Sequence, residues 1–564
     1  MRLSVCYILV SCQINSSKKD VSIEPKVIPL FGSEPFRLID QFSTAHTLAK
    51  YKNKRSIFLT YITGECFHLN EKNILLNLPK RENSESLLIS NNVYEKYEQY
   101  EHLFTPVLFD DFQFVTKAYD LTKVGSFVEI STENSSIISR GQIKFPGNEL
   151  NECQKKINYE TPSFSKAKEA FAKQCIRCHM QNINIDYFTS MSSIQKWSAM
   201  MSKTMETFRM PPGGVDAKLK YKTKGLLSRE ELVPLYKWLA SGAPNDKEDE
   251  KNLQEIRSTL EDKNLSNKFK NRKPDLVLKM KKKDIVPAQG NDYLEYSLLG
   301  GPFLEDTFFE AAQFEHNREA IHHSFIYINK NKKLVNSKAM VQSFYEEGQN
   351  IEAFLNNEKS IGKVIGSNLI FSNGGQGGSK ISYFGKHTGI FVPKGYYLTI
   401  ENHYHPNGYP QANQSVISFY KYQEKEPLVE IKRITISITK FSLQPNQSNL
   451  VIHSIYPIKK SIKLFSILPH LHMRGKEIKI FVKNKKNKME MLLSVPFYLY
   501  KHQTSLAFEN PVQIEKGSEI HFYVSYDNSI SNIGNPDSSK LILRGLNIFD
   551  DEMHSLILAY TEQE

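Results

Sequence analysis

The chain has 564 residues and carries 73 Lys and Arg against 61 Asp and Glu, which gives a formal net charge of +12. Its length accommodates several domains, and a hydrophobic content of 40% excludes a disordered or fibrous chain. The basic residues are mostly lysines, in runs such as 279–283 and 483–488, without an arginine and aromatic cluster. We therefore expect a solvated basic surface and no nucleic-acid partner.

Segment 1–20 has the organisation of an export signal. A charged start at Met1-Arg2 precedes an apolar run over 3–10, and Ser11 precedes Cys12. This order is typical of a secretory signal, and a buried first strand is the alternative. The residues that end at Cys12 also resemble a bacterial lipoprotein box, which implies a membrane tether through lipidated Cys12. We expect an exported protein, periplasmic or anchored to a membrane and facing outside the cytoplasm.

Residues 30–150 alternate between strand and helix signals. A β-prone run at 55–62 leads into Gly64-Glu65-Cys66, and further apolar runs follow at 105–109, 126–130 and 136–143. Alternation of this kind predicts an α/β domain.

Cys66 carries a resemblance to the thioredoxin-like redoxins. It stands where that family has its attacking cysteine, which implies a thioredoxin-like fold for this domain. However, Cys66-Phe67-His68-Leu69 lacks the second cysteine of a CxxC pair. Gly125 or a neighbour also stands where the family has a cis-proline. Without a resolving thiol, we expect a degenerate, structural redoxin-like domain rather than disulfide exchange.

Residues 160–245 favour helices. Apolar residues recur at helical spacing from Phe164 to Phe171, directly before a cysteine pair. Ser228 precedes two acidic residues and the apolar run 232–240, and Gly242 and Pro244 follow that run. The pattern predicts an all-α domain.

A c-type haem attachment motif lies in this helical segment. Cys175-Ile176-Arg177-Cys178-His179 fits C-x-x-C-H, in which two thiols bond the vinyl groups of one porphyrin and the histidine ligates the iron. A redox CxxC or half of a zinc site is the alternative, but no second cysteine pair completes a zinc site. We therefore expect covalent heme c.

Met210 is the expected second axial ligand of that haem. It lies in Arg209-Met210-Pro211-Pro212-Gly213-Gly214, which resembles the methionine loop of small c-type cytochromes. The resemblance implies a cytochrome c domain over 160–245. Thioether ligation raises the haem potential and suits electron transfer. The rival ligands are expected to face the core from the preceding helix: Met200, Met201 and Met205.

Residues 246–273 are almost wholly charged and polar, so we expect a linker. Beyond residue 274, short β-prone runs alternate with Gly, Asn and Pro turns, as at 397–400 and 520–526. This pattern predicts two antiparallel β-sandwiches, jelly-roll-like, over 274–427 and 428–564. No cysteine follows residue 178, so both must fold without disulfides.

Twelve of the 16 histidines lie beyond residue 300, and several are clustered. His470 and His472 face the same side of an extended chain and can bind one metal together. Adjacent His322 and His323 point to opposite faces of a regular strand, so joint ligation there requires a strand end or a bulge. A third cluster contains His403 and His405.

These clusters resemble the copper type II, ascorbate-dependent monooxygenases, the family of peptidylglycine α-hydroxylating and dopamine β-monooxygenases. That family has an HH pair, an HY(H) motif, an HxH pair and a late methionine in a D-E-M segment. The resemblance covers about residues 274–560 and implies two copper sites. The first would use His322, His323 and His403, and the second would use His470, His472 and Met553. Alternate ligands are His316, His387, His405 and Met473.

The resemblance implies a copper-dependent monooxygenase. Oxygen binds at the methionine-bearing copper in that family, which makes His470, His472 and Met553 the expected catalytic residues. We expect a small-molecule or peptide substrate, O2, and electrons from ascorbate or another redox protein, relayed by the haem. A non-catalytic electron-transfer, copper-binding or redox-sensing protein is the alternative.

Overall fold

The computed structural model describes residues 36–563 with internal gaps. The gaps are 93–94, 144–162, 177–187, 189, 207–215, 217–226, 264–268, 270–271, 291–292, 318–319, 331–368, 375–380, 405, 425, 427, 439, 501–502, 504, 533 and 546–548. The export segment with Cys12 therefore lies outside the described residues. In the described part of the chain, no helix is both long and apolar enough to cross a membrane.

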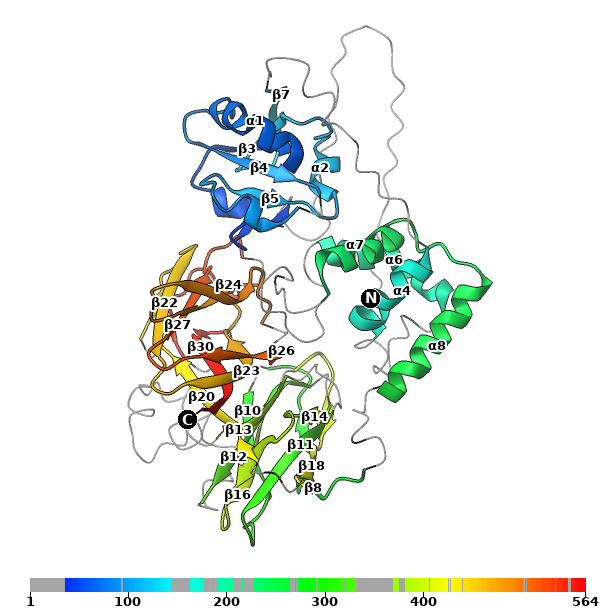
Figure 1. The fold of residues 1–564 in the computed structure, drawn as a ribbon, viewed down its shortest axis with the longest axis vertical. Coiled ribbons are helices and arrows are strands. Elements are labelled where there is room, and N and C mark those ends of the chain that lie inside the picture. The colour runs from blue at the N-terminus through cyan, green and yellow to red at the C-terminus, as the bar shows by residue number, and fades with distance from the viewer. Residues whose placement is uncertain are drawn as a thin grey trace.

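The molecule is multidomain and mostly β, with an N-terminal α/β region (Figure 1). That region contains one seven-stranded sheet in the order β2-β1-β5-β4-β3-β6-β7. Strands β3, β4 and β5 are parallel, whereas β6 and β7 form an antiparallel pair beside β3. The β3-α1-β4 unit followed by this pair is the thioredoxin-like arrangement, so the predicted fold of this region is confirmed. Its elements are β1 (Arg37–Ile39), β2 (Ala45–Thr47), β3 (Ser56–Ile62), α1 (Gly64–Leu76), β4 (Ser84–Ser90), β5 (Val107–Phe109), α2 (Phe114–Ala118), β6 (Ser126–Ser131) and β7 (Ile137–Gln142).

A helical region follows, with one shared core. Its helices are α4 (Phe164–Phe171), α6 (Met191–Glu206), α7 (Arg229–Ala240) and α8 (Lys247–Lys263), and a π-helical turn, η3 (Ala172–Ile176), follows α4. Phe164, Phe171 and Trp238 pack together in that core. The predicted cap of α7 is present, because Ser228 Oγ accepts from the Glu231 N–H and Glu231 Oε2 accepts from the Ser228 N–H.

The segment predicted as a linker, 246–273, contains α8. Asp246 Oδ1 accepts from the backbone N–H groups of Glu248 and Asp249 and so caps this helix. Leu253 and Ile256, three residues apart, place one apolar stripe against the helical core. These two apolar residues pack an otherwise charged helix against the helical core.

The first β unit is built from two sheets around one core. One sheet has the order β10-β16-β12-β13, and the other has the order β19-β15-β11-β18-β8, with β14 paired to β11. Phe309, Ile326 and Phe419 are among the core residues that both sheets contribute. Its strands are β8 (Leu276–Lys279), β9 (Asp284–Val286), β10 (Tyr293–Gly300), β11 (Thr307–Glu315), β12 (Ile321–Asn329), β13 (Leu369–Gly374), β14 (Ile381–Tyr383), β15 (Thr388–Val392), β16 (Tyr397–Tyr404), β17 (Gln411–Asn413), β18 (Val416–Lys421) and β19 (Val429–Glu430).

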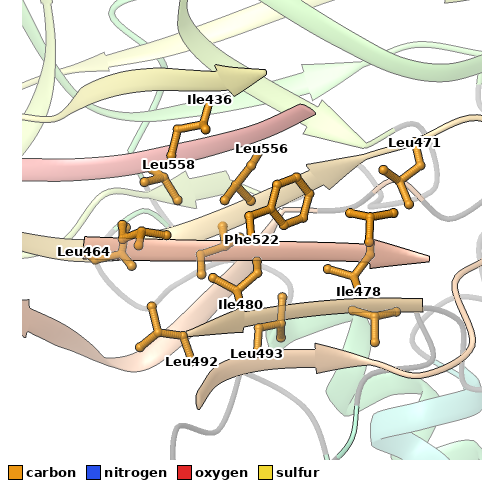
Figure 2. Close-up of a cluster of buried hydrophobic side chains, with 14 of the residues drawn as sticks. Ile436, Leu464, Leu471, Ile478, Ile480, Leu492, Leu493, Phe522, Leu556 and Leu558 are labelled. Atoms are coloured by element: carbon orange, nitrogen blue, oxygen red, sulfur yellow. The ribbon is translucent and has the colours of Figure 1, made fainter. Parts of the chain in front are cut away.

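The second β unit repeats this layering. Sheets β20-β30-β23-β26 and β22-β27-β24-β25 enclose the core in Figure 2, where Leu464, Phe522 and Leu556 come from both layers. Its strands are β20 (Lys432–Ser437), β21 (Ser442–Leu443), β22 (Leu450–Pro457), β23 (Ile462–His470), β24 (Gly475–Lys483), β25 (Met489–Val495), β26 (Leu506–Ile514), β27 (Glu519–Tyr526), β28 (Ile542–Arg544), β29 (Asp551–Glu552) and β30 (Ser555–Glu562). Two sheets around one core is the layering expected of a β-sandwich.

The second β unit lies between the N-terminal region and the first β unit (Figure 1). Lys479 Nζ donates to the Phe42 carbonyl, and Ser494 Oγ donates to the Ser43 carbonyl. Asp216 joins the same junction, because its carboxylate accepts from Ser43 Oγ at 2.6 Å and its N–H donates to the Ser494 carbonyl at 3.0 Å. Asp216, from the helical segment, is thus hydrogen-bonded to both the N-terminal region and the second β unit.

Candidate metal centre

The first histidine pair lies at an irregularity in β12. Against β16, Ile321 is opposite Tyr404 and His323 is opposite His403. His322 is therefore an extra residue, and the strand bulges at this point. The bulge that joint ligation by His322 and His323 requires is present. The side chain of His322 lies outside the described part of the structure.

His323 and His403 face one another across the β12 and β16 ladder. Their ring centroids are 4.7 Å apart at an interplanar angle of 86°, and the two side chains are only 3% and 4% exposed. Residues i and i+2 of β12 share a face, so Phe325 follows His323 on the same side, with ring centroids 4.6 Å apart. The strand pairing itself thus positions two of the three predicted ligands of the first site.

The HxH pair lies where β23 ends. Leu471 is fully buried in the core of the second β unit, and the Tyr498 hydroxyl bonds both its N–H and its carbonyl. Because side chains alternate along an extended chain, anchoring Leu471 in the core turns His470 and His472 to the opposite side together. Their ring centroids are 5.5 Å apart.

The pairing of β23 with β30 ends two residues short of Met553. His470 is opposite Ser555 in the antiparallel β23 and β30 ladder. Continuing that register places His472 opposite Met553, just beyond the end of the ladder. The His472 ring nitrogen Nδ1 lies 3.2 Å from the Asp551 carbonyl oxygen. A proton on Nδ1 that donates to this carbonyl leaves Nε2 as the ligand atom.

The two predicted sites meet at the junction of the β units. The rings of His323 and His470 have centroids 5.3 Å apart at 87°, so the four histidines form one continuous series, His403-His323-His470-His472. An apolar cluster beside the series also spans both units: Phe325, Tyr327, Leu369, Leu468 and Ile557. Side chains more than 140 residues apart in the sequence thus gather in one largely dry region.

No three of these four histidines have ligand atoms within 4.8 Å of one another. Among the described residues, one group of three histidines, cysteines or acids meets that limit, and it is His387, Glu424 and Glu426. The contacts of His387 are with Tyr422 at 2.9 Å and Glu424 at 3.5 Å. The four-ring series fits ligands divided between two metals, each completed by one further residue.

Glu552 is a buried acid that the sequence argument did not single out. Its carboxylate accepts from the backbone N–H groups of His472, Arg474 and Met553, the last two at 2.9 Å. Burial raises the pKa of Glu552 to about 7, although these donors and the charge of Arg474 oppose the rise. Its position in the Asp550-Asp551-Glu552-Met553 segment was the only signal in the sequence.

Glu401 is a second buried acid in the region. It lies two residues before His403, and the Tyr327 hydroxyl donates to it at 2.9 Å. Burial raises the pKa of Glu401 to about 6, against hydrogen bonds from Tyr296 and Tyr327 that lower it. Sequence reasoning missed it because a lone Glu in a strand gives no signal.

The haem motif is described only in part. Cys175 is half-buried in η3 and packs against the helical core, whereas Cys178, His179 and Met210 lie outside the described residues. Met205 is buried and Met201 packs against the core, as expected. Met200 was predicted to face the core, but it is 51% exposed because it lies on the solvent side of α6.

Cys66 is completely buried in the core of the N-terminal region. Burial in apolar surroundings disfavours the reactive thiolate, which is consistent with a structural cysteine. Gly125 adopts a φ of +82°, and its N–H donates to the Tyr61 carbonyl.

The remaining alternate ligands are not brought to the centre by any described contact. The His316 ring lies 6.1 Å from that of Phe314, and Met473 is half-buried between His472 and Arg474. His405 lies outside the described residues.

No family model matches the chain, and no curated protein does either. Among solved structures, the peroxidoxin BcpB from Mycobacterium tuberculosis is 17% identical, with a TM-score of 0.15, over 21% of this chain and 88% of that chain. A secreted M. tuberculosis disulfide oxidoreductase homologous to E. coli DsbE is 11% identical, with a TM-score of 0.16, over 21% and 91%. The major capsid protein P2 of bacteriophage PM2 is 10% identical, with a TM-score of 0.22, over 51% and 97%. The thioredoxin-like description of the N-terminal region rests on its strand order.

Proposed function

We propose that this chain is an exported haem–copper oxidoreductase, a copper-dependent monooxygenase that hydroxylates an organic substrate with O2. The observation that carries the proposal is the contact between His323 and His470, with ring centroids 5.3 Å apart. It joins two ligand sets that the sequence places in separate domains. Imidazole and thioether donors together suit copper.

The proposed ligands form two sets of three, one set for each copper. His322, His323 and His403 would hold one copper, and His470, His472 and Met553 would hold the other. Bound there, copper supplies one-electron chemistry and a site for oxygen. The hydrogen bond from His472 Nδ1 to the Asp551 carbonyl fixes the ring so that Nε2 is presented to the metal.

The surroundings of the histidines would exclude water. Phe325 and Leu468, one from each β unit, belong to the apolar cluster beside the histidine series. The Glu401 carboxylate accepts hydrogen bonds from the hydroxyls of Tyr296 and Tyr327. A dry site strengthens electrostatic interactions and protects reactive intermediates from hydrolysis. The substrate is proposed as a small organic molecule or a peptide.

The haem is proposed as the electron relay. Met210 precedes Asp216 by six residues in the sequence, and six residues span at most about 22 Å. Asp216 is pinned to the second β unit through Ser494. That tether supports a haem domain held close to the copper-bearing part of the chain. Ascorbate or another redox protein is the proposed external donor.

Oxygen consumption tests the proposed function. Protein matured with haem and loaded with copper is reduced, freed of excess donor and mixed with O2. We expect haem reoxidation that depends on copper and is slowed in His323→Ala, but not in the control His453→Ala, whose histidine stacks on Tyr523. Equal reoxidation rates with and without copper contradict the relay. With ascorbate supplied continuously, oxygen consumption that no organic compound increases favours a non-catalytic electron-transfer protein.

A further inference from the structure

Glu552 lies at a point where three backbone donors converge from two separate segments. The N–H groups of His472 and Arg474 come from the HxH segment, and the N–H of Met553 comes from the segment before β30. Glu552 is 0% exposed, so water does not compete for these bonds. Hydrogen bonds to a buried carboxylate are among the stronger ones in proteins.

The same segments carry the other anchors of the site. The Met553 carbonyl accepts from the Tyr526 hydroxyl at 2.8 Å, and His472 Nδ1 meets the Asp551 carbonyl at 3.2 Å. The Gly545 N–H donates to the Glu552 carbonyl at 3.0 Å, which holds the acid in β29. The carboxylate is therefore the only described group that bonds the backbone of His472 and the backbone of Met553 at once.

A buried positive charge balances this carboxylate. Arg474 is fully buried, its Nε donates to Asn528 Oδ1 at 2.9 Å, and its Nη1 donates to the Phe549 carbonyl at 2.8 Å. These bonds tie Arg474 to the loops on either side of the site. Two of the three guanidinium nitrogens are thus hydrogen-bonded to fixed groups, which favours one orientation of Arg474.

We propose that Glu552 is the positioning residue of the second copper site. It holds the backbones of His472 and Met553 in a fixed relation before the metal arrives, and so sets the affinity for Cu(I) and the presence of the thioether ligand. The proposal rests on the proposed function, because it takes His472 and Met553 as ligands. Glu552 itself does not touch the metal.

Glu552→Gln is the sharpest test, because it preserves size but replaces one acceptor oxygen with an NH2 group. In either orientation, that NH2 opposes at least one backbone N–H. We expect Cu(I) affinity at the second site to fall about 10- to 100-fold, the range found for residues that orient metal ligands. We also expect the sulfur contribution to the X-ray absorption spectrum of the Cu(I) protein to disappear.

Two variants act as controls. Glu477→Gln changes another acid of the same unit, whose partner is Lys479 at 3.4 Å, and should leave Cu(I) affinity within twofold. Tyr526→Phe removes only the hydroxyl bound to the Met553 carbonyl, so its effect should be smaller than that of Glu552→Gln. The Cu(I) affinity of the first copper site, measured in each variant, shows whether that variant has folded.

The outcomes separate the two proposals. If the unchanged protein binds no copper, the proposed function fails. If it binds two coppers and Glu552→Gln retains both affinity and sulfur scattering, the positioning role is overturned while the function stands. An equal loss of affinity in Glu552→Gln and Glu477→Gln also overturns it, because a general loss of stability would then explain the result.

Discussion

The two β units place their proposed metal-binding side chains by different means. In the first unit, His323 and His403 are opposite one another in a paired ladder, and a bulge at His322 supplies the third residue. In the second unit, His472 and Met553 lie beyond the end of the ladder, where Glu552 holds them. Sheet geometry would therefore form one site, whereas the other would depend on the buried carboxylate of Glu552.

Removing a ligand from the ladder-built site should have the largest effect. His323→Ala deletes a ligand and also the ring that contacts His403 and His470. We expect copper affinity at the first site to fall at least 100-fold, beyond the usual effect of residues that only orient ligands. Titration with a Cu(I) chelator measures it, and His453→Ala is the control. Unchanged copper affinity in His323→Ala would show that His323 is not a ligand of the first copper.

Separating the two sites tests whether they depend on each other. Phe325→Ala opens a cavity in the apolar cluster that joins the β units, at a side chain that is 9% exposed. We expect a loss of about 3–5 kcal/mol in unfolding free energy. We also expect the distance between the two bound Cu(II) ions to change, which pulsed electron paramagnetic resonance measures. An unchanged distance would show that the apolar cluster does not hold the two sites together.

The N-terminal region contains none of the proposed copper ligands, so a buried acid in this region serves as a control. Burial raises the pKa of Asp110 to about 6 from its usual 3.8, although hydrogen bonds from Thr116 lower it. The folded state therefore binds this proton more tightly than the unfolded state does. Its contribution to stability is complete below about pH 4 and is lost as pH rises through 6, about 3 kcal/mol in all.

Asp110→Asn should remove this pH dependence. The free energy of opening of β3 amides, measured by hydrogen exchange with correction for intrinsic rates, should then be flatter between pH 4 and 7 than in the unchanged protein. The copper affinities of both β units should not change. A parallel pH profile in the two proteins would show that Asp110 ionises normally.

The smallest effect is expected where the helical segment meets its neighbours. Asp216→Ala leaves the Ser43 and Tyr97 hydroxyls without this acceptor, and it leaves the backbone bond to Ser494 in place. We expect a cost of about 1–3 kcal/mol. Slower electron transfer from haem to copper, at unchanged copper content, would show that Asp216 holds the relay in place. Unchanged electron transfer would limit Asp216 to a structural role.

The sequence predicted those features that depend on local patterns. The alternation around Cys66, the Ser228 cap and the strands that carry His323 and His470 all follow from spacing and residue type. The requirement for a bulge at His322 also followed from strand geometry, and the structure has it.

Features that depend on tertiary packing were not predictable. Residues 246–273 were predicted as a linker because charge dominates them, yet Leu253 and Ile256 pack α8 against the helical core. The roles of Glu552 and Glu401 could not be read from the sequence, because donors that bind them come from distant segments: His472 and Arg474 for Glu552, and Tyr327 for Glu401. The contact between His323 and His470 depends on how two separate units pack, which no motif records.

The copper-to-iron ratio per chain tests the central claim most directly. Protein matured with haem and reconstituted with copper should contain two coppers and one iron, and His472→Ala should lose one copper and keep the iron. One iron with no retained copper would contradict the account. The cytochrome assignment would then stand alone, and the histidine series at the junction would be a structural feature of two packed β units.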